Sequence, residues 1–133
     1  MMDAAATRRV RHRAADICEY CHLPESAFDI PFHIEHVRAR QHRGDDSPDN
    51  FCLACDRCNL YKGPNLAGID PETDEITPLF HPRRQDWSEH FAVADCEVHG
   101  LTPCGRATVS LLKMNDPPRT RLRMQLSRGD DLD

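Results

Sequence analysis

The first half of the chain shows an alternation of apolar and polar positions that is typical of a β-strand. Over residues 27–37, phenylalanine and isoleucine alternate with polar residues, and Pro31 restricts such a strand to an edge or breaks it. Residues 51–54 form a short apolar run that predicts a returning strand. The polar, turn-rich residues 38–49 predict the loop between the two strands.

Helices are predicted on both sides of this pair of strands. Residues 7–16 read as a helix with Thr7 as its N-cap, and residues 55–62 as a short helix that Gly63 and Pro64 end. The core order is therefore strand, loop, strand, helix. This order predicts an α+β fold with an N-terminal helix.

The second half of the chain predicts an extension of mixed α/β character. Residues 69–80 resemble a small hairpin or turn, and residues 105–115 form an amphipathic pattern that the prolines at 117 and 118 should end. A final helix is predicted through Leu122 and Leu126. We expect one domain with a core over residues 14–66, an extension over 67–128 and a disordered acidic tail over 129–133.

Composition narrows the class of protein. The 133 residues are 6% aromatic and 29% charged, which predicts one polar domain with a small apolar core. No run approaches 18 apolar residues, and the arginine-rich start lacks the apolar stretch of a secretory signal. We therefore expect a cytoplasmic protein that does not enter a membrane.

The cysteines provide the clearest chemical pattern. Two Cys-x-x-Cys pairs are separated by 33 residues, and two such turns can aim four thiolates at one tetrahedral zinc ion. The alternative is local disulfides or free thiols, which a reducing compartment and an odd total of seven cysteines disfavour. The zinc would have no open coordination position, so its role would be structural. The predicted ligands are Cys18, Cys21, Cys55 and Cys58, while Cys52, Cys96 and Cys104 are predicted to be small core residues.

A second group of residues lies between the cysteine pairs and directly after the second pair. Glu35 and His36 end the first predicted strand, and Asn59 directly follows the fourth cysteine. Because the zinc would hold the strand end near the helix start, these three side chains could converge. A carboxylate and an amide oxygen suit a hard divalent cation, and a neutral histidine can take a proton from water. The pattern is therefore consistent with phosphodiester hydrolysis, although a lone histidine is more often structural.

The stretches CEYC, FHIEHVRAR, DNFCLACDRCN and YKG together resemble the zinc-bound form of the HNH endonuclease family. The resemblance implies a ββα-metal fold in which His36 is the general base and Asn50 holds the loop and orients that histidine. It also implies that Glu35 and Asn59 bind the catalytic cation and that the four cysteines bind structural zinc. Glu35 and Asn59 stand where the family often has aspartate and histidine, which favours Mg²⁺ or Mn²⁺. Only Gly44 remains of two glycines common in the loop.

The net charge and the distribution of basic residues lead to opposite predictions about nucleic-acid binding. The formal net charge of −5 is unfavourable for phosphate binding, but the basic residues are clustered. Arg38, Arg40, Arg43 and Lys62 are predicted to contact nucleic acid, with an ordinary solvated surface as the alternative. The same two interpretations, contact with nucleic acid or an ordinary solvated surface, apply to the arginines over residues 8–13. These arginines cannot all lie on one helix face.

The favoured hypothesis is a metal-dependent endonuclease that hydrolyses DNA. One alternative is a non-catalytic zinc-ribbon module that binds nucleic acid, and another is a zinc-containing protein-interaction domain. The predicted partner is DNA, with a protein partner or a homodimer as further possibilities. The intact set of Glu35, His36 and Asn59 favours the enzyme, because a binding module does not require it.

Overall fold

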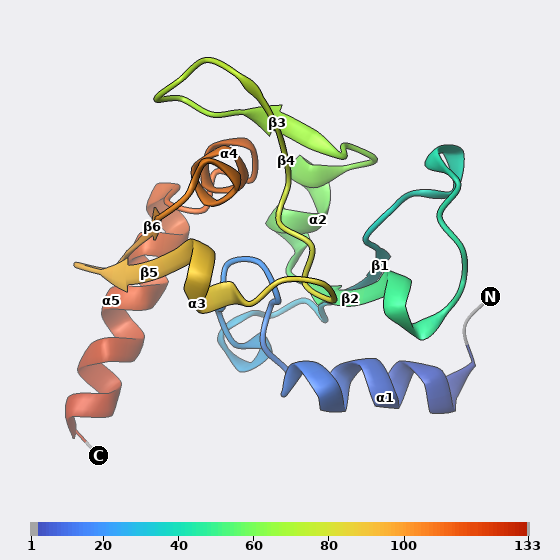
Figure 1. The fold of residues 1–133 in the computed structure, drawn as a ribbon. Coiled ribbons are helices and arrows are strands. Elements are labelled where there is room, and N and C mark those ends of the chain that lie inside the picture. Colours follow the sequence, from blue (N-terminus) through green and yellow to red (C-terminus); the bar gives the residue numbers. More distant parts are fainter. Residues whose placement is uncertain (1–2, 133) are drawn as a thin grey trace.

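Three small antiparallel hairpins and several helices build residues 3–132, the part of the chain that the computed structural model describes (Figure 1). This mixture confirms the predicted α+β class. The elements are α1 (Ala4–Ala14), β1 (His33–His36), β2 (Phe51–Ala54), α2 (Asp56–Lys62), β3 (Ala67–Ile69), β4 (Ile76–Pro78), α3 (Trp87–His90), β5 (Phe91–Ala94), β6 (Glu97–Gly100), α4 (Pro103–Leu111) and α5 (Pro117–Leu132).

The β1–β2 hairpin and α2 form the predicted strand, loop, strand, helix unit. β1 pairs with β2 in antiparallel register from His33 opposite Ala54 to His36 opposite Phe51. Every residue of β2 is buried, so this strand lies at the centre of the apolar core. Helix α2 begins after Cys55 and ends at Gly63, whose φ of 51° is a conformation that glycine adopts without strain.

The predicted strand over residues 27–37 is too long, because only His33–His36 pairs with β2. A 3₁₀ turn over Glu25–Ala27 precedes it, and the Glu25 carboxylate accepts hydrogen bonds from the Phe32 amide and the Arg11 guanidinium. These contacts hold the segment away from the sheet. The alternating apolar side chains of this stretch therefore did not mark a continuous strand.

Helix α1 lies beneath the β1–β2 hairpin (Figure 1), with Val10 buried in the core. The helix begins earlier than predicted, because Asp3 and not Thr7 is the N-cap, and its carboxylate accepts from the Ala6 amide at 2.7 Å. Arg13 donates to the Phe51 carbonyl at 2.8 Å. The helix is therefore attached to β2 by both packing and hydrogen bonding.

The extension contains more sheet than the sequence predicted. The hairpin of β3 and β4 overlaps the expected region 69–80, although β3 begins two residues before it, whereas the hairpin of β5 and β6 was missed. Helix α4 begins at Pro103, where the Thr102 hydroxyl caps it, and Pro117 begins α5 as well as following α4. Helix α5 continues to Leu132, and position 133, the last of the predicted tail, lies outside the described residues. None of the described helices has the length and apolarity that crossing a bilayer requires.

Candidate functional site

The four cysteines of the two Cys-x-x-Cys pairs meet in the core. Their sulfur atoms all lie within 4.8 Å of one another, and Cys21 Sγ is 3.7 Å from Cys55 Sγ. Sulfur atoms at about 2.3 Å from one tetrahedral zinc ion would be about 3.8 Å apart, so the cluster has the size that zinc requires. Among the side chains that the structure describes, residues 3–129, no other group of three or more His, Cys, Asp or Glu is placed to hold a metal. The cluster thus fits a closed, structural zinc site.

Arg119 of α5 reaches this cluster from the extension. Its side chain is fully buried, and its guanidinium lies 3.1 Å from Cys58 Sγ and 3.1 Å from the Asp116 carboxylate. Burial acts to lower the pKa of Arg119, but the Cys58 and Cys21 thiols, together with Asp116, raise it above its ordinary value. Four thiolates on a Zn²⁺ ion carry about two negative charges. Arg119 therefore places a cation where that charge would otherwise be uncompensated.

His36 ends β1 on the face of the hairpin that looks toward α1. Its Nε2 atom is 2.8 Å from the Asp46 carboxylate, and its ring packs against Phe51 with centroids 4.8 Å apart. Arg40 donates to the same carboxylate at 3.2 Å. The hydrogen bond from His36, with the charge of Arg40, lowers the pKa of Asp46 despite slight desolvation. The histidine is thus held in one orientation while 27% of its side chain stays exposed.

Two further residues, Asn50 and Gly44, hold the loop that carries Asp46. The Asn50 amide accepts from the Arg38 backbone N–H at 2.9 Å and donates to the carbonyls of Arg38 and Asp45 at 3.0 and 2.8 Å. Gly44 passes so close to Arg38 that a Cβ atom would lie 1.7 Å from the Arg38 carbonyl oxygen. A larger residue at position 44 would therefore displace the loop and, with it, Asp46.

Glu35 faces the opposite side of the hairpin, because it pairs with Cys52 while His36 pairs with Phe51. Only 8% of Glu35 is exposed, and its Oε1 lies 3.5 Å from Cys52 Sγ. Burial raises the pKa of Glu35 although the ammonium of Lys62 acts to lower it. No ion pair within 4.0 Å reaches this carboxylate from the described residues. It is a buried acid that lacks a direct cationic partner.

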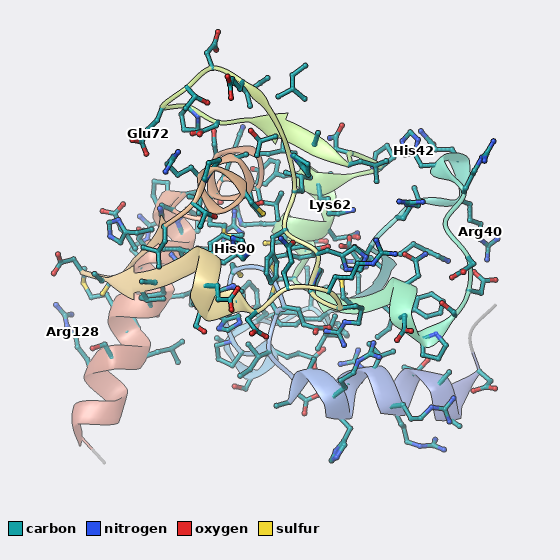
Figure 2. The ribbon with its side chains drawn as sticks, in the orientation of Figure 1. Arg40, His42, Lys62, Glu72, His90 and Arg128 are labelled. Atoms are coloured by element: carbon teal, nitrogen blue, oxygen red, sulfur yellow. The ribbon has the colours of Figure 1, made fainter. Side chains whose placement is uncertain are left out.

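Helix α2 packs against β1 and carries Asn59 and Lys62 one turn apart. Lys62 was predicted to contact nucleic acid, but its side chain is buried and its ammonium donates to the Val37 carbonyl at 2.8 Å (Figure 2). It therefore holds α2 to the end of β1 and does not face solvent. Glu35 lies near enough to this lysine for the ammonium to act on its pKa, whereas His36 lies on the other face. Glu35 and His36 therefore do not share one face of the hairpin.

The basic residues after β1 remain on the surface. Arg38, Arg40 and Arg43 are all exposed, and Figure 2 shows Arg40 at the outer edge of the loop. Among their side chains, the described structure records an ion pair only for Arg40, with Asp46. Arg38 and Arg43 are thus open to an anionic ligand.

The model of the HNH endonuclease family matches residues 18–65. Residues 18–65, the HNH segment, are thus similar to this family over about a third of the chain. The match contains both cysteine pairs, β1, β2 and α2, and it indicates nuclease activity and a metal requirement, in agreement with the cysteine cluster. The extension from β3 to α5 lies outside the matched residues. A search of curated proteins and a search of solved structures found no match to the chain.

Two residues that contact the candidate site were not predicted from the sequence: Asp46, which contacts His36, and Arg119, which contacts Cys58. Asp46 stood in a turn-rich stretch, where an aspartate is ordinarily a turn residue, so nothing distinguished it as the partner of His36. Arg119 lies 61 residues from Cys58 and belongs to no motif. No local pattern could have predicted either contact.

Proposed function

We propose that this protein is a metal-dependent endonuclease that hydrolyses phosphodiester bonds in DNA, with His36 as the general base. The observation that carries the proposal is the hydrogen bond of His36 to Asp46 at the open end of β1, within the HNH segment. A histidine that is both fixed and solvent-accessible can take a proton from water near neutral pH. The His36 side chain is both held in place by Asp46 and partly exposed to solvent.

Asp46 gives His36 a defined tautomer. The carboxylate accepts the hydrogen bond from Nε2–H, which leaves the Nδ1 lone pair free to accept a proton from the attacking water. Asn50 and Gly44 support this by fixing the loop from which Asp46 projects. Asp46 is thus a positioning residue, and His36 is the group that would touch the reacting atoms.

Glu35 and Asn59 are the residues that we propose to hold the catalytic cation. A carboxylate and an amide oxygen suit Mg²⁺ or Mn²⁺, and a buried acid without an ion-pair partner gains from a bound cation. When bound, such an ion supplies charge stabilisation for the phosphate and the leaving oxygen. Glu35 and His36 are consecutive, with Cα atoms about 3.8 Å apart, so a cation held by Glu35 would lie at the same end of β1 as His36 but on the opposite face of the hairpin.

Replacing His36 with alanine is expected to slow plasmid nicking by about 100- to 10,000-fold, the range that a general base contributes. The measurement is the initial rate of supercoiled plasmid relaxation with Mg²⁺ or Mn²⁺, in samples of equal zinc content. His36 is not a zinc ligand, and its ring is partly exposed, so the variant should keep its fold.

His33→Ala is the matched control for this experiment. His33 lies on the same strand, is more exposed than His36 (41% against 27%), and pairs with Asp56 of α2 at 3.1 Å. We expect it to nick DNA at the rate of the unmodified protein. An equal loss in both variants, or none in His36→Ala, would exclude His36 as the base. Zinc-loaded protein that binds DNA without cutting it would point instead to a non-catalytic binding module.

A further inference from the structure

A groove with a volume of about 910 Å³ runs between α1 and the loop that precedes β2. One wall is the exposed side of α1, and the other includes Asp46, Pro48 and Phe51. Of the seven α1 residues that line it, three are arginines and one is a histidine, and the other three are apolar: Arg8, Arg9, Arg13 and His12, with Ala5, Ala6 and Val10. The groove therefore has a positive wall in a chain whose formal net charge is −5.

The arginines of α1 point in different directions, because neighbouring positions on a helix lie on different faces. Arg11 points away from the groove and pairs with Glu25 at 2.6 Å. Arg13 donates to the carbonyls of Pro48 and Phe51, which leaves its charge without a carboxylate partner. For Arg8 and Arg9 the described residues provide no ion pair or side-chain hydrogen bond. Cations without protein partners are available to an anionic ligand.

This groove is continuous with the surroundings of His36. A neighbouring hollow of about 380 Å³ is lined by His36, Arg40, Ile34 and Thr7, and it shares Ala6, Asp46 and Phe51 with the first. Two carboxylates also line these hollows, but both are engaged. Asp46 binds His36 and Arg40, and Asp3 caps α1. Arg40 thus offsets part of the charge of Asp46 where the two hollows join, and Asp3 lines only the smaller hollow.

We propose that α1 is a DNA-binding element, and that its groove face guides one strand of the phosphate backbone to His36. This inference rests on the proposed nuclease function and names the surface that receives its substrate. The family match begins at residue 18, so it does not include this helix. The 11 residues of α1 span about 16 Å, which corresponds to about five nucleotides at about 3.4 Å of axial rise each.

The test is DNA binding by zinc-loaded protein without Mg²⁺ or Mn²⁺, so that the result is independent of cleavage. The probe is a fluorescein-labelled 20-base-pair duplex, followed by anisotropy over a range of salt concentrations. The variant is Arg8→Ala with Arg9→Ala. Both positions are exposed helical sites at which alanine is well tolerated, and circular dichroism and zinc content verify the fold.

The matched control is Arg121→Ala with Arg128→Ala, which removes the same charge from exposed positions of α5, remote from α1 (Figures 1 and 2). We expect the α1 variant to bind about 50-fold more weakly at about 0.1 M salt, with the slope of log affinity against log salt reduced by about 1.8. The control should change neither quantity by a comparable amount.

Equal affinities for the two variants would overturn the role of α1, and so would a wild-type protein that does not bind the duplex at low salt. A wild-type protein that binds DNA through α1 but never nicks it would leave this inference standing. That outcome would reject only the nuclease proposal, so the two failures are distinguishable.

Discussion

Replacing Cys55 with serine is expected to leave the chain largely unfolded at 25 °C. The change removes one of four sulfur ligands and also the thiol that accepts from the Cys58 amide at the start of α2. Structural zinc supplies about 10–16 kcal/mol in small domains, whereas the net stability of a domain is about 5–15 kcal/mol. Loss of the site therefore removes about as much free energy as the fold has in total. Thermal unfolding by circular dichroism, with zinc content measured in parallel, tests this expectation.

Cys104→Ser is the matched control for that change. Cys104 is half-buried, lies outside the cluster and makes only a long contact of 3.9 Å from the Gln85 amide. This variant should retain one zinc ion per chain and unfold near the temperature of the unmodified protein. If Cys55→Ser kept its melting temperature, the cysteine cluster would have no structural role.

Replacing Arg119 with methionine is expected to lower the free energy of unfolding by about 3–5 kcal/mol, the usual cost of removing one partner from a buried ionic contact. The guanidinium touches Cys58 Sγ and Asp116, and it also donates to the carbonyl of Lys113. Methionine can fill much of the space but cannot offset the charge of the zinc thiolates. Urea unfolding with zinc present measures the change.

Arg121→Met provides the comparison within the same helix. Arg121 is exposed on α5, so the same substitution there should change the free energy of unfolding by less than about 0.5 kcal/mol. Similar stabilities for the two variants would show that Arg119 does not support the cysteine cluster. A faster release of zinc to a chelator in Arg119→Met alone would further identify the cluster as the affected site.

The local elements of the HNH segment could be predicted from the sequence because their determinants lie close together in the chain. The two Cys-x-x-Cys turns, the apolar run at 51–54 and the helix ended by Gly63 each depend on a few neighbouring residues. The β5–β6 hairpin was missed because neither of its strands has a strong apolar–polar alternation. Val98 is its one deeply buried aliphatic side chain, while Val93 is 52% exposed.

The candidate site was harder to predict than the fold. Glu35, His36 and Asn59 were expected to converge, but the two-residue period of a strand directs consecutive side chains to opposite faces. The partner of His36 depends on how the loop closes, which Gly44 and Asn50 determine through backbone contacts that no motif encodes. The separation of Arg11 from Arg8 and Arg9 likewise follows from where Glu25 lies in space.

The most direct test of a nuclease site separate from the zinc site is a nicking assay in which both metals are followed. Zinc-loaded protein is freed of weakly bound ions, and plasmid nicking is measured before and after Mg²⁺ or Mn²⁺ is added, with zinc determined in each sample. We expect nicking to require the added ion while zinc stays at one per chain. Nicking that proceeds at full rate without Mg²⁺ or Mn²⁺, or that varies only with zinc content, would contradict a separate catalytic cation beside His36.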